Sequence, residues 1–411
     1  MPKLTKKRLI LFLAIIGPGI ITSAADNDAG GIITYSKSGA LYKYDMLWII
    51  VLLTFVLAMT QEMCARMGVV TQKGLGELIR ENFGVKWTMF ALCTLFIANL
   101  ATTVAEFAGI AASLSIFGVS KFISVPLAGI LIWFLVVKGT FKLVERVFLL
   151  LTLLFGTYII SGLAAHPNWH EVATSTFIPK INLNPNFLFL AIAVIGTTIT
   201  PWMQFFLQAT VVDKGVRLKE LKYQKWDVFI GSFLTDVVSF FIIVATGTLV
   251  FGHISAVNEA KDVANALAPV AGNYAKYLFA IGLFNASLLA AAVLPLSTAY
   301  TFTEAFGWEI GISRKFAEAP MFYSIYTLSI IFGVTVVLLP LNLVDTMISA
   351  QAINGILLPV ILVFMLKLIN RKDVMGKYTN SKLYNFVIWT MVIVLIAMTI
   401  GTLVGTLLGY G

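Results

Sequence analysis

Long apolar stretches alternate with short polar segments along almost the whole chain. A run of about 20 apolar residues is long enough to cross a bilayer as a helix. Eleven such stretches can be recognised, at residues 9–36, 45–66, 87–116, 122–138, 143–164, 186–213, 227–252, 273–305, 319–341, 346–369 and 383–408. The first, third, sixth and eighth are longer than one crossing requires, which leaves room for tilt or for a break. The pattern predicts an all-α polytopic membrane protein with a single transport domain spanning residues 1–411.

Composition and charge support this interpretation and add an orientation. Of the 411 residues, 59% are hydrophobic and 12% are charged, whereas soluble domains carry about 25% charged residues. If the N-terminus is cytoplasmic, 23 of the 29 Lys and Arg residues fall in cytoplasmic segments. The positive-inside rule therefore predicts a plasma-membrane protein with the N-terminus inside and the C-terminus outside. The net charge of +9 then reflects membrane topology, and we expect no nucleic-acid partner.

Two of the predicted spans are interrupted by polar residues, glycine or proline. The first contains ITSAADNDAGG (residues 21–31), and the sixth contains GTTITPW (residues 196–202). Interruptions at corresponding positions of two halves indicate an inverted-repeat transporter, here with repeats at about 9–164 and 186–369 and an extra helix at 383–408. Pro201 lacks an amide proton and Gly30-Gly31 tolerates unusual dihedrals. Both spans can therefore unwind at mid-membrane and expose carbonyl oxygens.

The carboxylates of the first interruption are the strongest functional signal. A carboxylate at the centre of a membrane helix costs about 2.5–3.5 kcal/mol on insertion scales, and here Asp26 and Asp28 lie two residues apart. Carboxylates beside free carbonyl oxygens have the composition of a hard-cation site. The alternative is that Asp26 caps the second half-helix or binds a polar neighbour. Asn27 is expected to point to another side of the turn.

Other polar residues lie at membrane depth, and each has a structural alternative. Thr197, Thr198 and Thr200 either bond the preceding turn or face an ion beside Pro201. Glu106 is a proton relay, part of an ion path or a structural hydrogen-bonding group. Gln351 and Asn354, which lie three residues apart, either join helices or form a neutral oxygen pair that closes a site.

Enzyme functions receive little support from the sequence. It contains no GxxxxGK[ST] nucleotide-binding motif and no HExxH zinc motif, and no Ser-His-carboxylate set within the membrane. We expect no enzymatic activity, no bound nucleotide and no resident cofactor. A channel is possible, but paired broken helices fit alternating access better than a continuous pore.

Several motifs together resemble those of the Nramp divalent metal transporters. They are Gly17-Pro-Gly19, Asp28-Ala-Gly-Gly31, Ala65-Arg-Met-Gly-Val-Val-Thr71 after the second span, Val104-Ala-Glu-Phe-Ala-Gly109, and Gln351 with Leu358-Pro359. The resemblance covers nearly the whole chain. It implies a LeuT-type fold with eleven helices, a 5+5 inverted repeat and broken first and sixth helices.

The departures from this family also indicate a function. Gly31 stands where the family has asparagine, Thr200 where it has a metal-binding methionine, and Trp202 where it has a histidine linked to proton movement. The third span keeps Glu106 but has Thr103 where the family has an Asp. Loss of a soft thioether removes discrimination against hard cations. The pattern is similar to that of the prokaryotic Nramp-related magnesium transporters, which implies Mg²⁺ transport, with Mn²⁺ also carried and no proton coupled.

The sequence thus predicts a secondary transporter or facilitator that moves divalent cations, chiefly Mg²⁺, inward as partly hydrated ions. The expected metal contacts are Asp28, Asp26, Ala25, Thr197, Thr200, Gln351 and Asn354. The expected pathway residues are Asn27, Gly31, Glu106, Trp202 and Gln204. The main alternative is a proton-coupled Mn²⁺/Fe²⁺ symporter of the ordinary Nramp type. An organic-solute transporter and a non-transporting metal sensor are two further alternatives.

Overall fold

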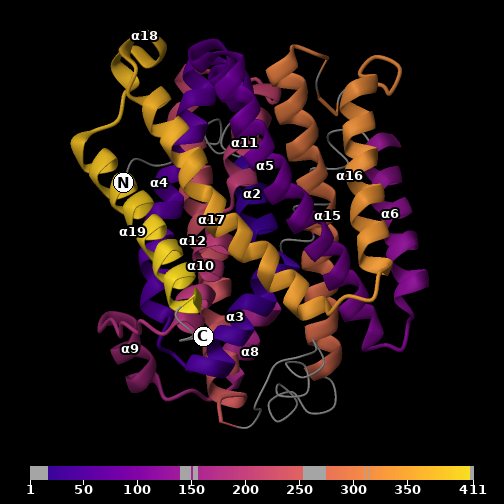
Figure 1. Ribbon diagram of the computed structural model, residues 1–411, viewed down its shortest axis with the longest axis vertical. Coiled ribbons are helices and arrows are strands. Elements are labelled where there is room, and N and C mark those ends of the chain that lie inside the picture. The colour runs from indigo at the N-terminus through magenta and orange to yellow at the C-terminus, as the bar shows by residue number, and fades with distance from the viewer. Residues whose placement is uncertain are drawn as a thin grey trace, which may run out of the picture.

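Helices make up the regular secondary structure of this protein. The computed structural model describes residues 17–138, 150, 156–252, 275–309, 311–312 and 314–407, and within those ranges every regular element is a helix (Figure 1). The long helices are α4 (Leu47–Thr71), α5 (Leu75–Ser115), α6 (Lys121–Lys138), α12 (Leu221–Leu249), α15 (Ala275–Phe306), α16 (Pro320–Leu338), α17 (Leu343–Ile369) and α19 (Lys382–Leu407). The shorter ones are α2 (Pro18–Asp26), α3 (Ala29–Tyr42), α8 (Gly156–Ala164), α9 (Trp169–Phe177), α10 (Pro185–Thr198), α11 (Pro201–Asp213), η1 (Leu218–Glu220), α18 (Lys372–Met375) and η3 (Gly376–Tyr378).

The prediction of a multi-pass all-α protein is confirmed. In the described part of the chain, nine helical segments are long and apolar enough to cross a membrane, with α10 and α11 counted together. The predicted first span (9–36) and fifth span (143–164) lie partly outside the described residues, so the count of eleven stays a prediction.

Several boundaries differ from those predicted, including the end of α3 at Tyr42 and the beginning of α12 at Leu221. Helix α5 begins at Leu75 instead of residue 87, because an amphipathic segment is joined to the span at Gly84, where the backbone leaves helical geometry (φ 76°). Helix α4 continues to Thr71, so the Ala65–Thr71 motif is helical and does not form a loop after the span. Arg66 can remain in this helix because it pairs with Glu62 one turn earlier, at 3.1 Å.

Both predicted helix breaks are present. Helix α2 ends at Asp26 and α3 begins at Ala29, with Asn27 and Asp28 in non-helical conformations between them. Helix α10 ends at Thr198 and α11 begins at Pro201. The amide-free ring of Pro201 starts the second half-helix, where the first amides have no partner in any helix.

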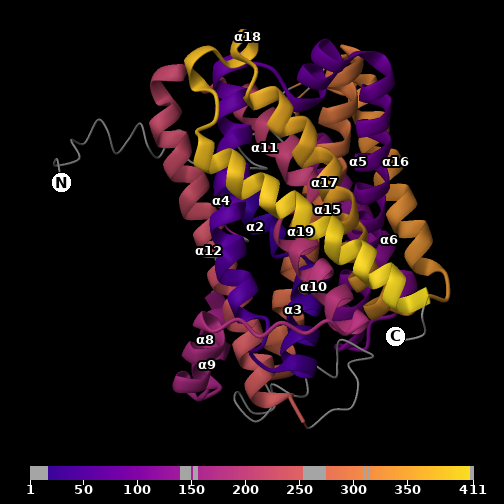
Figure 2. The ribbon, with the colours of Figure 1, turned by 60° about the vertical axis from the view of Figure 1, so that its left-hand side comes forward.

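The broken helices lie inside a shell of longer ones. Helix α12 packs against α2, α3 and α4, while α5 packs along α15 and α17. Helix α10 packs against α17, and α19 crosses the outside of α17 and α10 (Figure 2). The two breaks are therefore surrounded by α5, α12, α15 and α17.

Asp227 of α12 fixes the beginning of α2. Its carboxylate accepts hydrogen bonds from the backbone amides of Gly17 (3.1 Å), Gly19 (2.6 Å) and Ile20 (3.3 Å). A Cβ atom at Gly19 would lie 2.8 Å from this carboxylate. The Gly-Pro-Gly motif thus provides the close approach that lets a carboxylate of a distant helix cap α2.

Glycines also set the spacing between α10 and α17. A Cβ atom at Gly196 would lie 2.2 Å from the backbone oxygen of Gln351, and one at Gly355 would lie 2.4 Å from that of Ile192. Only glycine allows backbones to approach so closely, as at other small-residue crossings in membranes. This crossing places Gln351 beside the second helix break.

Candidate metal site

Asp28 lies in the first break and is held by three hydrogen bonds. It is the N-cap of α3, and its Oδ1 accepts from the backbone amide of Gly31 at 2.5 Å. The side-chain amide of Gln351 donates to Oδ1 and Oδ2 at 3.1 and 3.0 Å. These contacts join the first broken helix to α17. The alternative that Asp26 caps the second half-helix is wrong, because Asp28 is the N-cap of α3.

Gln351 is itself held in place by a short chain of polar side chains. Its Oε1 accepts from Nδ2 of Asn354 at 2.9 Å, and the same Nδ2 donates to Thr102 of α5 at 2.9 Å. In this arrangement, the nitrogen of Gln351 faces Asp28 and its oxygen faces Asn354. For its oxygen to contact a cation beside Asp28, the amide plane would have to turn over. Asn354 orients Gln351 and does not itself contact Asp28.

Gly31 packs closely against three oxygen atoms of the two breaks. A Cβ atom placed on Gly31 would lie 2.8 Å from Thr197 Oγ1, 3.1 Å from Asp28 Oδ1 and 3.3 Å from the backbone oxygen of Asp26. These atoms come from both broken helices, and they are a hydroxyl, a carboxylate and a carbonyl. This combination of oxygen ligands suits a hard divalent cation.

The breaks also release backbone oxygens from the helical ladder. In a continuous helix, the amide of Ala29 would bond the carbonyl of Ala25, but here it donates to Glu106 Oε2 at 3.0 Å. Pro201 has no amide to offer the carbonyl of Thr197. The expected carbonyl contacts, Ala25 and Thr197, are therefore the ones whose usual helical partner is lost. Glu106 stabilises the break from the side of α5.

The three threonines of the second break differ in their contacts. Thr198 donates to the backbone oxygen of Val194 at 2.8 Å, and its hydroxyl lies 2.8 Å from that of Tyr35. The alternative that this threonine bonds the preceding turn is therefore confirmed. The hydroxyls of Thr197 and Thr200 are buried and have no hydrogen-bond partner among the described residues. Buried hydroxyls are usually satisfied, so these two can bind a substrate ion or the water that it carries.

Asp26 and Asn27 point toward α12 in different ways. Asn27 donates to the backbone oxygen of Thr235 at 3.2 Å and accepts from Ser239 at 3.1 Å, which makes it an interhelical contact. Both carboxylate oxygens of Asp26 are buried without a hydrogen-bond partner in the described part of the chain, as are those of Asp236, one residue beyond Thr235. Asp236 is distant from the first break in the sequence, so only the fold brings it close to that break.

Gln204 and Trp202 are buried in α11 near the second break. Gln204 accepts from the thiol of Cys64 at 3.3 Å and donates to the backbone oxygen of Thr200 at 3.4 Å. The carbonyl of Trp202 accepts from Ser297 at 3.0 Å. The structure thus ties both residues to neighbouring helices, and their assignment to the pathway stays a prediction. No motif in the sequence indicates that Cys64 of α4 lies beside Gln204.

The site is buried, and no ion pair within the described residues neutralises its carboxyl groups. Asp26, Asp28, Glu106 and Gln351 are each 0% exposed. The described ion pairs include none of the three carboxylates. Within the described ranges, no three His, Cys, Asp or Glu side chains are grouped so that they could hold a metal ion. A cation bound here would therefore depend on Asp28 together with carbonyls, hydroxyls and its own waters.

Comparison with known proteins extends the resemblance to the whole fold. A model of the family described as natural resistance-associated macrophage protein-like (Nramp) matches residues 19–405. A manganese transporter from Eremococcus coleocola, crystallised with an aromatic bis-isothiourea substituted compound, has 18% sequence identity and a TM-score of 0.82, with 98% of this chain and 88% of that chain covered.

More distant transporters share the architecture as well. A Na⁺-coupled sialic acid symporter in a substrate-bound outward-open state has 14% identity and a TM-score of 0.64 over 94% of this chain and 89% of that chain. MhsT in complex with L-phenylalanine has 16% identity and a TM-score of 0.59 over 94% and 97%. The predicted LeuT-type fold is therefore confirmed.

Proposed function

This chain belongs to the Nramp family, and we propose that it is a facilitator that carries divalent cations into the cytoplasm, chiefly Mg²⁺ and also Mn²⁺. The observation that carries the proposal is the set of three oxygens around the missing Cβ atom of Gly31. The Eremococcus coleocola protein of the same fold is a manganese transporter, which supports Mn²⁺ as a second cargo.

The chemistry of the site favours a partly hydrated ion. Mg²⁺ requires near-octahedral oxygen coordination at about 2.0–2.1 Å and gives up its waters reluctantly. The side chains supply one nearby carboxylate, Asp28, together with carbonyl and hydroxyl oxygens. The unpartnered oxygens of Thr197, Thr200 and Asp26 can hydrogen-bond waters that remain on the ion. A site of this kind need not strip Mg²⁺ completely.

Selection against Mg²⁺ is weak in such a site. The family resemblance implies that ordinary members bind metal through a methionine thioether, which favours transition metals. Here that position is Thr200, whose hydroxyl is a hard donor, and Gly31 removes a further amide ligand. These substitutions favour passage of Mg²⁺ while leaving Mn²⁺, which accepts similar oxygen ligands, as an alternative cargo.

Inward transport does not require a coupled proton. A membrane potential supplies about 2.3 kcal/mol per charge per 100 mV, so a dication gains roughly twice that amount. Trp202 replaces the histidine that the family links to proton movement, and its indole does not titrate near neutral pH. Glu106 accepts a hydrogen bond from the backbone amide of Ala29, so its carboxylate stabilises the helix break. We therefore expect uptake that follows the potential and not the pH gradient.

The two broken helices are the elements that we expect to move during transport. Asp28 and Gln351 connect the first break to α17, and the closed site separates the two faces of the membrane. When an ion approaches Asp28, the positive end of the Gln351 amide must turn away, because it would otherwise face the cation. We propose that this turn accompanies the passage between outward-facing and inward-facing states.

Flux measurements with the purified chain in proteoliposomes test the proposal. Uptake of Mg²⁺, Mn²⁺, Ca²⁺ and Fe²⁺ is compared at fixed membrane potential, with and without a pH gradient. We expect Mg²⁺ and Mn²⁺ uptake without acidification of the lumen. Metal-driven acidification, or uptake of Mn²⁺ and Fe²⁺ without Mg²⁺, would instead identify an ordinary proton-coupled symporter.

Asp28→Ala gives the corresponding residue test. The variant is expected to abolish uptake, because the principal charge of the site is removed. It should remain folded, because the loss of the α3 N-cap costs only about 0.5–2 kcal/mol. Asp373→Ala is the matched control, since Asp373 is exposed and pairs with Arg371 away from the breaks. Mg²⁺ flux at the wild-type level in folded Asp28→Ala would overturn the assignment of the site.

A further inference from the structure

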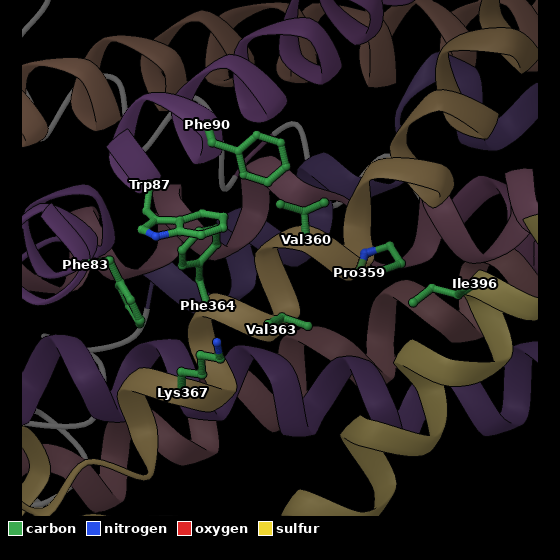
Figure 3. Close-up of a pocket in the computed structure, with 9 residues that line it drawn as sticks. All are labelled: Phe83, Trp87, Phe90, Pro359, Val360, Val363, Phe364, Lys367 and Ile396. Carbon is green, nitrogen blue, oxygen red and sulfur yellow. The ribbon is translucent and has the colours of Figure 1, made fainter. Parts of the chain in front are cut away.

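A groove on the membrane-facing surface lies apart from the metal site. It has a volume of about 410 Å³ and is formed by α5, α17 and α19. Figure 3 shows its aromatic side chains and Lys367 gathered on one side, with Pro359 and Ile396 on the other. Apart from Lys367, the lining side chains are hydrocarbon or aromatic.

Aromatic rings that pack against one another form one wall of the groove. Phe364 packs edge-on against Phe83 with centroids 5.2 Å apart, and Trp87 lies 6.4 Å from Phe364. Trp87 and Phe90 are each about half exposed (52% and 49%), so their outer faces are free to contact lipid. Tryptophan at such a position is typical of the membrane–water interface, where its ring is apolar and its N–H is wet.

Lys367 adds a positive charge at the end of this wall. It lies three residues after Phe364 on the same face of α17. Within the described residues it makes no ion pair and no side-chain hydrogen bond. The stretch of α17 from Pro359 to Lys367 rises by about 12 Å. The charge pattern predicts that the Lys367 end faces the cytoplasm.

We propose that this groove binds one anionic phospholipid, with the phosphate against Lys367 and an acyl chain along Val363 toward Ile396. An apolar groove that opens to the bilayer suits a hydrocarbon chain, and an unpaired cation at headgroup depth suits an anion. A soluble apolar molecule would gain nothing from the lysine. A soluble anion would gain nothing from the aromatic wall.

The position of the groove links the lipid to the transport helices. Helix α17 carries Gln351, α5 carries Glu106, and residues of both line the groove together with Ile396 of α19. Pro359 lines the groove and removes one backbone hydrogen bond from α17. A lipid bound in the groove packs against α17 beside Pro359, where that backbone hydrogen bond is missing, and does not touch the metal site.

Native mass spectrometry of the full chain in detergent tests the inference. The protein is incubated with phosphatidylglycerol or phosphatidylcholine that carry the same acyl chains. We expect one retained phosphatidylglycerol per chain, favoured over phosphatidylcholine by roughly five-fold, the preference that one basic residue gives at an anionic surface. Lys367→Ala should remove the preference. Lys382→Ala, which removes an exposed lysine outside the groove, should retain it.

A second pair of variants tests the acyl chain. Val363→Trp fills the groove and should reduce retention of both lipids, whereas Val404→Trp, on an exposed part of α19, should not. Equal retention of the two lipids by the wild-type chain would show annular lipid only and overturn the proposal. Identical behaviour of Lys367→Ala and Lys382→Ala would overturn it as well. None of these measurements depends on which cation is transported.

Discussion

Gly31→Ala is the substitution that tests the geometry of the site most directly. The added methyl group would press against the three oxygens that lie next to Gly31. It would lie 2.8 Å from Thr197 Oγ1, so that hydroxyl must recede by about 0.6 Å to reach the 3.4 Å of ordinary contact, and Asp28 Oδ1, at 3.1 Å, by about 0.3 Å. Displacements of this size change the arrangement of the oxygens that would contact the ion.

The expected result is a loss of affinity with retention of the fold. Rearrangements next to metal ligands typically cost about 10–100-fold in affinity, and we expect the KM for Mg²⁺ uptake to rise by that factor. Overpacking of this kind costs about 1–3 kcal/mol in stability, which a folded membrane protein can absorb. The assay is the Mg²⁺ dependence of uptake in proteoliposomes that contain equal amounts of folded protein.

Gly401→Ala is the matched control. It adds the same methyl group to a helical glycine of α19, where the nearest neighbouring atom would lie 3.7 Å away. Its uptake should equal that of the wild type. If folded Gly31→Ala also keeps the wild-type KM and maximal rate, the three oxygens next to Gly31 do not bind the cation, and the reasoning from them is refuted.

Two further predictions concern selectivity and stability. Thr200→Met returns a soft donor to the second break and should shift competition uptake from Mg²⁺ toward Mn²⁺ by roughly tenfold. Thr402→Met, in α19, should leave it unchanged, and an unaltered ratio in Thr200→Met would exclude position 200 from the selectivity of the site. Asp227→Ala removes the acceptor of three backbone amides at the start of α2 and should destabilise the protein by about 2 kcal/mol, the upper end for a helix cap. Thermal melting of the purified protein measures this loss, and a melting temperature equal to that of Asp373→Ala would contradict the capping role.

Local sequence features determined much of this architecture. The length of the apolar runs requires helices, since a backbone in lipid must satisfy its own hydrogen bonds. The breaks followed from Pro201 and from the polar residues between Asp26 and Gly31, and both are present where they were predicted. The departures at Gly31 and Thr200 can likewise be recognised from the sequence, because residue type alone decides whether a side chain offers oxygen, sulfur or nothing.

Contacts between distant segments could be decided only by the tertiary structure. No local signal shows that Asp227 caps α2 or that Asn27 bonds α12, because each contact joins residues more than 200 positions apart. The sequence predicted Gln351 and Asn354 as an equivalent pair, yet packing makes one the partner of Asp28 and the other its support. Hydrophobic pattern fixes which faces are buried, but the glycine crossing of α10 with α17 sets which polar atoms meet. The residue types thus determine which chemistry is available to the site. Close packing between helices determines the role of each residue.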